Sequence, residues 1–68
     1  MKTLTMEDAR KNPNRKFSRR QAAEILEVKE HRIDDYARKG YLKHGVSART
    51  GRRYFLGRHI SEFYVRWQ

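Results

Sequence analysis

The stretch VKEHRIDDYARKGYL, residues 28–42, predicts a short helix around which the rest of the chain is arranged. Ile33, Tyr36 and Ala37 lie at i, i+3 and i+4, so they form one apolar stripe along the helix. Gly40 follows the last basic turn and suits the left-handed residue that commonly closes a helix. We therefore expect about three turns of helix that bury one face and leave the other face polar.

A second helix is expected just before it, because Ser18 and Gln21 form a capping-box signature with Phe17 as the apolar residue before the cap. Its apolar side chains share one face and comprise Ala22, Ala23, Ile25 and Leu26. Only about three residues separate the two helices, too few for a long side-by-side return. The helices should therefore cross steeply, as in a helix-turn-helix, with Val28 filling the turn.

Beyond Gly40 the pattern favours strands. Residues 42–46 and 52–56 carry aliphatic and aromatic side chains that suit strands, and the polar residues 47–51 lie between them. This arrangement predicts a hairpin.

The predicted hairpin carries the most one-sided charge in the chain. Five Lys and Arg residues and no Asp or Glu occur from Lys43 to Arg58, and Arg49, Arg52 and Arg53 bracket the loop. Charged side chains on a ribbon also protect exposed strand edges from aggregation, but either sign of charge serves that purpose. The lack of acids therefore favours a hairpin that faces phosphate groups.

The last stretch predicts a helix with an aromatic stripe. Gly57 is acceptable at its N-cap, and large side chains then recur at i, i+3, i+4 and i+7, namely Ile60, Phe63, Tyr64 and Trp67. A chain this small needs their mass in its core, so we interpret the stripe as packing rather than as a platform for stacking bases. Trp67 has a second interpretation, as a docking residue for another copy or a partner protein.

Composition limits the chain to one domain with a polyanionic partner. Its 68 residues leave room for one small core, and 17 Lys and Arg residues against 8 Asp and Glu give a net charge of +9. Nucleic acid is the leading candidate partner, and an acidic membrane surface is the second. A basic surface that is merely well solvated is the alternative to both.

The sequence also excludes several classes of protein. It has no cysteine, which rules out a disulfide scaffold and a thiolate metal site and fits a reducing cytoplasm. No apolar run approaches the ~20 residues that span a bilayer, so we expect a soluble, cytoplasmic protein. His31, His44 and His59 fall on different predicted elements, without metal-ligand or nucleophile–base spacing. We therefore expect no catalysis, no cofactor and no bound metal.

Residues 1–16, MKTLTMEDARKNPNRK, are expected to form a flexible basic arm, because they mix charges with Asn and the chain's only proline. Their few apolar residues suffice for one weak helical turn at most. The basic side chains of this arm suit a phosphate backbone or a minor groove, and they include Arg10, Lys11, Arg15 and Lys16. A terminus that only improves solubility is the alternative. The folded domain is expected to span residues 17–68.

In order and spacing, these segments resemble the MerR-like winged-helix domain in its small, excisionase-type version. The resemblance covers Phe17 to about Trp67 and rests on FSRRQAAEILEV, VKEHRIDDYARKGYL, and GRRYFL leading into HISEF. The positions that match are Ser18, Ala22 with Ala23, Val28, Ile33 with Tyr36, and Gly40 with Leu42. The resemblance implies a mainly helical α+β fold, a winged helix-turn-helix of three helices with a two-stranded wing. It also implies that double-stranded DNA binds with the second helix in its major groove and the wing on the flanking backbone.

Two positions at the turn depart from this family pattern. Glu27 stands where the turn usually has a glycine, and Lys29 stands where the second helix usually has a Ser or Thr N-cap. Because lysine is a weaker cap, this helix is expected to start less firmly than in the family.

An acidic pair on the second helix departs from the pattern as well. Asp35, with Asp34 beside it, stands at a position that is commonly basic in excisionase-type relatives. Pairing within the helix, with Arg32, Arg38 or Lys39, is the interpretation we favour for Asp34. Asp35 either pairs in the same way or accepts a hydrogen bond from cytosine N4.

The expected roles at DNA follow from position along the chain. Base reading is assigned to the start of the second helix, with Lys29, His31 and Arg32, and to Asp35 one turn further on. Arg32 is the preferred base reader, because a guanidinium group binds guanine O6 and N7. Phosphate contacts are assigned to Arg19, Arg20, Arg38, Lys39, Lys43, Arg49, Arg52, Arg53 and Tyr54. For Tyr54, packing under the wing is the alternative.

Two DNA-binding functions compete. An excisionase-like factor binds repeated sites, bends DNA and helps a phage or mobile-element integrase to run in the direction of excision. A small transcriptional regulator occupies a promoter instead. We favour the first because only one helix follows the wing, and we expect copies to bind head to tail along DNA. An RNA-binding or protein-interaction module is the more distant alternative, motivated by Asp34, Asp35 and Trp67.

Overall fold

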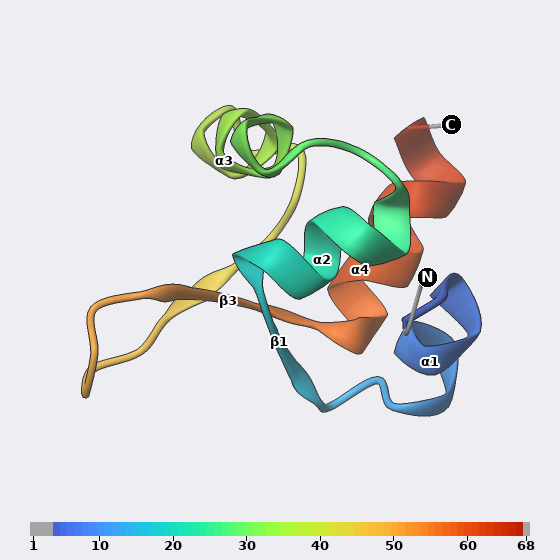
Figure 1. Ribbon diagram of the computed structural model, residues 1–68, viewed down its shortest axis with the longest axis horizontal. Helices are drawn as coiled ribbons and strands as arrows, with labels where there is room; N and C mark the ends of the chain where they lie inside the picture. Colours follow the sequence, from blue (N-terminus) through green and yellow to red (C-terminus); the bar gives the residue numbers. More distant parts are fainter. Residues whose placement is uncertain (1–3, 68) are drawn as a thin grey trace.

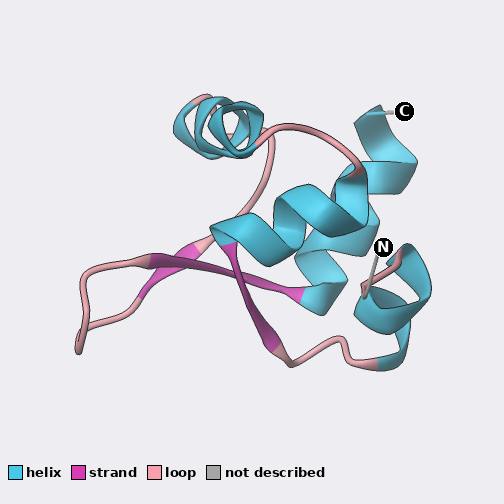
Figure 2. Cartoon of the chain, viewed as in Figure 1, coloured by secondary structure: helices cyan, strands magenta, loops and turns pink. Residues whose placement is uncertain are grey.

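A computed structural model describes residues 4–67, and in this range four helices surround a small antiparallel sheet (Figures 1 and 2). The helices are α1 (Met6–Lys11), α2 (Arg19–Leu26), α3 (Glu30–Arg38) and α4 (Gly57–Trp67). The strands are β1 (Lys16–Ser18), β2 (Gly45–Val46) and β3 (Arg53–Leu56). The predicted class, a mainly helical α+β domain, is therefore confirmed.

The boundaries of α2 and α3 follow the predicted signals. The Ser18 hydroxyl accepts a hydrogen bond from the Gln21 backbone N–H at 3.2 Å, and the Gln21 side-chain oxygen accepts one from the Ser18 N–H at 2.9 Å. Helix α2 ends at Glu27, whose φ of 59° lies in the left-handed region. Gly40 adopts the same region after α3, with φ 81°. Glu27 thus adopts a left-handed conformation that costs some backbone strain, whereas a glycine would adopt it without strain.

The sheet has one more strand than the expected wing. Its order is β1-β3-β2, because residues at the end of the expected arm pair antiparallel with β3. Phe17 of β1 lies opposite Phe55 of β3, and both side chains are fully buried. The expectation of a two-stranded ribbon alone is corrected accordingly. Residues 45–54, which comprise β2, the loop and the start of β3, project from this sheet, and we call them the wing (Figure 2).

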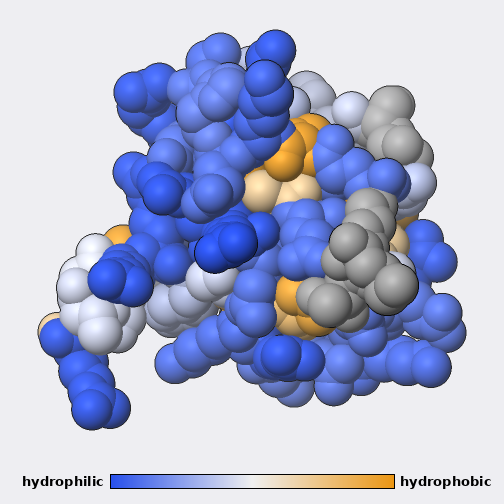
Figure 3. All heavy atoms as spheres, viewed as in Figure 1, coloured by the Kyte–Doolittle hydropathy of each residue, from blue (hydrophilic) through white to orange (hydrophobic). Residues whose placement is uncertain are grey.

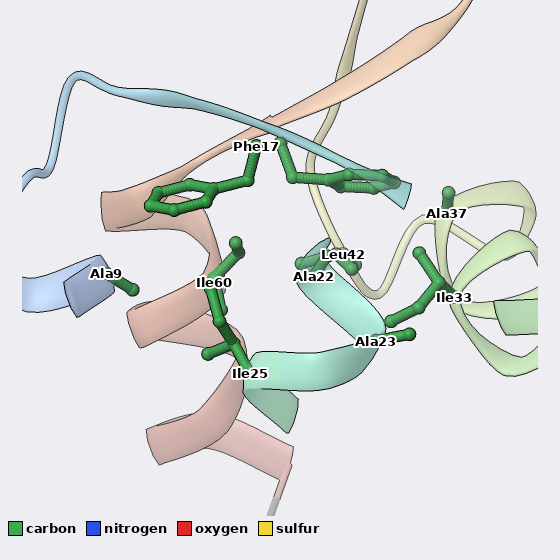
Figure 4. Packing of buried hydrophobic residues seen from close by; sticks show 10 residues of the cluster. Ala9, Phe17, Ala22, Ala23, Ile25, Ile33, Ala37, Leu42 and Ile60 are labelled. Carbon is green, nitrogen blue, oxygen red and sulfur yellow. The ribbon is translucent and has the colours of Figure 1, made fainter. Parts of the chain in front are cut away.

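The core is small and draws on all four helices as well as on the paired strands β1 and β3. Its largest fully buried side chains are Phe17, Ile33, Leu42, Phe55 and Ile60. Ile33 of α3 is directed at Ala23 of α2 (Figure 4), and the small alanine side chain lets the two helices approach closely. Ala37 is the other buried residue of α3. The predicted inner stripe is thus confirmed for Ile33 and Ala37, with Tyr36 partly buried against the same cluster.

Part of the expected flexible arm is folded against α4. Helix α1 begins where the Asp8 carboxylate accepts a hydrogen bond from the Thr5 backbone N–H at 2.8 Å, and its Ala9 is fully buried. The expectation of one weak turn is wrong for residues 6–11, because it overlooked this cap and the packing of Ala9 beside α4 (Figure 4). Residues 1–3 of the expected arm lie outside the described residues. The domain boundary at residue 17 stays a prediction.

The aromatic stripe of α4 is only partly core. Ile60 is fully buried, whereas the ring of Phe63 is partly buried and lies 4.8 Å from that of Tyr36. The Trp67 ring lies 4.5 Å from that of Tyr41, and both residues stay about half exposed. The stripe therefore packs on the end of α3 and on the segment that follows it.

Gly57 allows α1 to dock on the start of α4. A Cβ atom at this position would lie 2.2 Å from the Asn12 carbonyl oxygen and 2.5 Å from that of Ala9. We predict that Gly57→Ala lowers the free energy of unfolding by about 1–3 kcal/mol, because the neighbouring backbone must move. Urea denaturation followed by circular dichroism measures this loss.

Val65→Ala is the matched control, because Val65 lies on the same helix and is 73% exposed. Its unfolding free energy is expected to stay within about 0.5 kcal/mol of the starting protein. Equal stabilities for the two variants would contradict the close approach of α1 to Gly57.

We expect His59 of α4 to make folding sensitive to acid. Its Nδ1 atom is buried and has no hydrogen-bond partner among the described residues. Burial lowers the pKa of this imidazole below 6.5, and the positive charge of Arg58 lowers it further. The unfolded chain then binds a proton more readily than the folded chain, so the free energy of unfolding falls as the pH drops through about 6.5.

Denaturation at pH 7.5, 6.5 and 5.5 tests this effect against His59→Gln, which cannot titrate at this position. The starting protein is expected to lose more stability than the variant over this range. Parallel curves for the two proteins would show that the His59 environment does not resist protonation.

Candidate nucleic-acid interface

Helix α3 and the wing project from the same side of the molecule, with the first residues of α2 between them (Figure 1). An open groove of about 870 Å³ lies among these three segments. It is lined by Ser18, Arg19, Arg20, Glu30, Asp34, Val46, Gly51, Arg52 and Arg53. Cations that the sequence placed on separate elements, at the start of α2 and on the wing, therefore meet at one surface.

The expected base readers lie at the exposed start of α3. Lys29 is the N-cap residue, and its side chain makes no capping hydrogen bond, in keeping with the weaker cap expected there. Lys29, His31 and Arg32 are all exposed. The three side chains are thus accessible on the first turn of the helix.

Asp35 takes one of the two roles left open for it. Its carboxylate forms an ion pair with Arg38, three residues further along α3. This pair is intrahelical and stands on the outer face, where the Arg38 side chain is 72% exposed. A contact from Asp35 to cytosine stays a prediction.

Asp34 pairs differently from the expectation. Its Oδ2 lies 2.8 Å from Arg19 Nη1, and its Oδ1 lies 3.2 Å from Arg53 Nη1. The expected pairing with cations of its own helix is therefore wrong. Asp34 lies on the side of α3 that faces α2 and the wing, a direction that spacing along the sequence does not reveal.

The remaining expected phosphate-binding residues fall into two groups. Arg49, Arg52 and Arg53 lie on the wing and Arg20 at the start of α2, all of them exposed. At the other end of α3, Arg38 closes the helix, Lys39 is its C-cap, and Lys43 follows. Lys43 borders a small cavity of about 40 Å³ beside α4, together with His59 and Arg66. The structure does not bring Lys43 into the groove between α3 and the wing.

Tyr54 packs within the wing. A Cβ atom at Gly45, its cross-strand partner, would lie only 2.3 Å from the Tyr54 ring, so the ring lies across the glycine backbone. On its other neighbour strand, Lys16 Nζ lies 4.8 Å from the centre of the ring. Packing was one of the two roles expected for Tyr54, and a phosphate contact of its hydroxyl stays a prediction.

Lys16 belongs to the sheet and not to the flexible arm expected for residues 1–16. It is the first residue of β1 and pairs with Leu56 of β3. A strand of three residues is too short for periodicity to reveal. Its place next to Tyr54 adds one more cation close to the wing.

Hydrophilic residues cover most of the face shown in Figure 3, and hydrophobic residues reach that face only in small areas. An apolar groove of about 330 Å³ is lined by Leu26, Val28, Tyr36, Tyr41, Phe63, Tyr64 and Trp67. It shares no residue with the groove between α3 and the wing. The cationic and aromatic surfaces are thus separate.

Among residues 4–67, no three His, Asp or Glu side chains are grouped closely enough to hold a metal ion. None of the helices in that range is both long and apolar enough to cross a membrane.

Residues 17–65 match a family model described as MerR HTH family regulatory protein. The matched range begins at Phe17 of β1 and ends within α4, so it contains α2, α3 and the wing. No curated protein and no solved structure matches the chain.

Proposed function

Because the chain belongs to the MerR HTH family of regulatory proteins, a family of non-enzymatic DNA-binding domains, we propose that it is a small transcriptional regulator that occupies promoter DNA. DNA binding itself follows from the family. The observation that best supports the regulatory role is the family match, which describes a regulatory protein over residues 17–65.

In this proposal α3 is the recognition helix and enters the major groove with its first turn. Lys29, His31 and Arg32 are exposed on that turn and are not held in any ion pair among the described residues. Arg32 binds guanine through O6 and N7, since its guanidinium matches that pair of acceptors. Lys29 and His31 contact neighbouring base edges.

The phosphate backbone is bound by cations on both sides of the recognition helix. Arg19, Arg20, Arg52 and Arg53 line the groove beside α3 and suit one strand of the duplex. Arg38, Lys39, Lys43 and Arg49 suit phosphates further along the site. Contacts of this kind set the affinity and the register of the protein, while the base contacts set the sequence preference.

An excisionase-like factor that assists an integrase is the second candidate. The segment from Phe17 to Trp67 resembles the excisionase-type version of the domain in the order of its parts, and this resemblance favours the second candidate. Head-to-tail binding of several copies belongs to this candidate.

An RNA-binding or protein-interaction module is the more distant candidate, motivated by Asp34, Asp35 and Trp67. Trp67 is about half exposed, while both carboxylates have arginine partners: Asp34 pairs with Arg19 and Arg53, and Asp35 pairs with Arg38. The acids therefore do not oppose a phosphate-facing surface as two free negative charges would.

The contribution of Arg32 can be measured on duplexes that the protein enriches from a randomised pool. Arg32→Ala is expected to weaken binding to the enriched duplex by about 1–3 kcal/mol and to leave a scrambled duplex nearly unaffected. Arg52→Ala is the control, because loss of a phosphate contact weakens both duplexes alike. Equal losses for both variants on both duplexes would contradict the role of Arg32 as a base reader.

The electrostatic part of the interface is tested by salt. If about five phosphates are neutralised, the logarithm of the association constant should fall with the logarithm of the salt concentration with a slope of roughly −4.5. Titrations of duplex DNA, single strands and structured RNA at one salt concentration complete the test. A slope near zero, or tighter binding to structured RNA than to duplex DNA, would contradict the proposed function.

A regulator and an excisionase-like factor differ in what their binding changes. For a regulator, the footprint overlaps a promoter, and transcription from it changes when Arg32→Ala replaces the starting protein. For an excisionase-like factor, footprints grow in steps over repeated sites, and excision by an integrase increases while transcription stays the same. The second pattern would replace the proposed function by the second candidate.

A further inference from the structure

The carboxylate of Asp34 joins three elements of the interface. One oxygen contacts Arg19 at the start of α2 at 2.8 Å, and the other contacts Arg53 at the start of β3 at 3.2 Å. Asp34 itself lies in the middle of α3. A single side chain therefore connects the helix that reads DNA to the helix behind it and to the wing beside it.

We propose that Asp34 is a positioning residue that holds the wing at a fixed place relative to the recognition helix and thereby sets how well the protein discriminates between DNA sites. This inference rests on the proposed contact of α3 and the wing with one duplex. Asp34 acts through Arg53 and Arg19, and it need not touch DNA itself.

The wing has few other attachments to α3. Helix α3 packs mainly on α2, while the wing is anchored through β3 to β1 and through its own short ladder of two residue pairs, Gly45–Tyr54 and Val46–Arg53. Among the described residues, the contact from Asp34 to Arg53 is the ion pair that bridges α3 and the wing. Loss of this contact frees the wing from α3 without removing a buried side chain.

The charges around Asp34 nearly cancel. Arg19 Nε also lies 3.4 Å from Glu30 Oε1, so two arginines face two carboxylates in this cluster. Two guanidinium groups on neighbouring elements repel each other unless an anion lies between them. Asp34 supplies that anion, and without it the Arg53 side chain and the strand that carries it are expected to move away from Arg19.

Asp34 leaves the arginines able to bind phosphate. A guanidinium group has five N–H donors, and the contact from Arg53 to Asp34 involves Nη1 alone. The Arg53 and Asp34 side chains are 38% and 33% exposed, so solvent and DNA have access to the remaining donors. The carboxylate therefore orients the cation toward the groove rather than blocking it.

The stability of the fold is not the main role of this cluster. Ion pairs with this degree of exposure contribute little to folding. Asp34→Asn should therefore leave the domain folded, which allows binding and wing motion to be measured in the variant.

The removal of one negative charge has opposite effects on two kinds of DNA. A scrambled duplex is expected to bind Asp34→Asn as tightly as the starting protein or more tightly, with a salt slope that is steeper by up to about 0.9 if one more phosphate is contacted. The duplex enriched by the starting protein is expected to bind more weakly, because the wing no longer meets its backbone at the right distance. The ratio of the two association constants should fall about tenfold, as when one well-placed contact is lost.

Glu7→Gln is the control that is matched in charge. Glu7 lies on α1, away from the interface, and pairs only with Lys11 among the described residues. The same change in net charge there should leave the ratio unaltered. A fall of equal size in Glu7→Gln and Asp34→Asn would overturn the proposal, because it would trace the effect to net charge alone.

A double-variant cycle separates positioning from a direct role of Asp34. If Asp34 acts through Arg53, Asp34→Asn should lower the ratio of association constants about tenfold in the starting protein. In a protein that already carries Arg53→Ala, the same change should lower that ratio by much less than half of this factor. Equal falls in both backgrounds would overturn the role of Arg53 as the intermediary.

Backbone amide relaxation of the free protein tests the positioning without DNA. The order parameters of residues 45–53 should drop in Asp34→Asn and stay unchanged in Glu7→Gln. One outcome separates the two proposals. If neither the starting protein nor Asp34→Asn binds duplex DNA, but the order parameters of the wing still drop in Asp34→Asn, the proposed function fails and the positioning role stands. Unchanged order parameters together with an unchanged ratio would overturn the proposal.

Discussion

The position of α3 depends on the burial of Ile33 and Ala37 against the alanine-bearing face of α2. A helix of nine residues is too short to be stable alone, so its place in space comes from this contact. Ala22 and Ala23 make the contact possible because they let the backbones of α2 and α3 approach. The directions of the outward-facing polar side chains of α3 therefore depend on how this small apolar contact orients the helix.

The electrostatics of the interface follow from that orientation. Once Ile33 points inward, Asp34 comes to lie next to Arg19 and Arg53, while Asp35 faces Arg38 on the outer side. Asp34 and Asp35 thus form ion pairs with arginines. Lys29 and Arg32, at the first turn of α3, stay exposed. A chain with a net charge of +9 can in this way carry carboxylates within the surface that we propose for DNA binding.

Local signals predicted the central part of the fold, because they act over a few residues. The capping box of Ser18 and the glycine after α3 placed both helices, and the hairpin followed from strand-forming residues around a loop. What sequence could not predict depends on residues far apart in the chain. Strand β1 is recognised only through its pairing with β3. Helix α1 has a local signal in the cap formed by Thr5 and Asp8, but its docking depends on the space that Gly57 leaves for it. The partners of Asp34 lie 15 and 19 residues away, so helical spacing pointed to the wrong cations.

We propose that α3 and the wing bind the same duplex from one side of the molecule. The most direct measurement is a titration of the isotopically labelled protein with the enriched duplex, followed through backbone amide chemical shifts. We expect the largest chemical-shift changes in residues 29–35 and 46–53 and little change in α1. Changes that gather on α1 and α4, with α3 and the wing unaffected, would contradict this proposal.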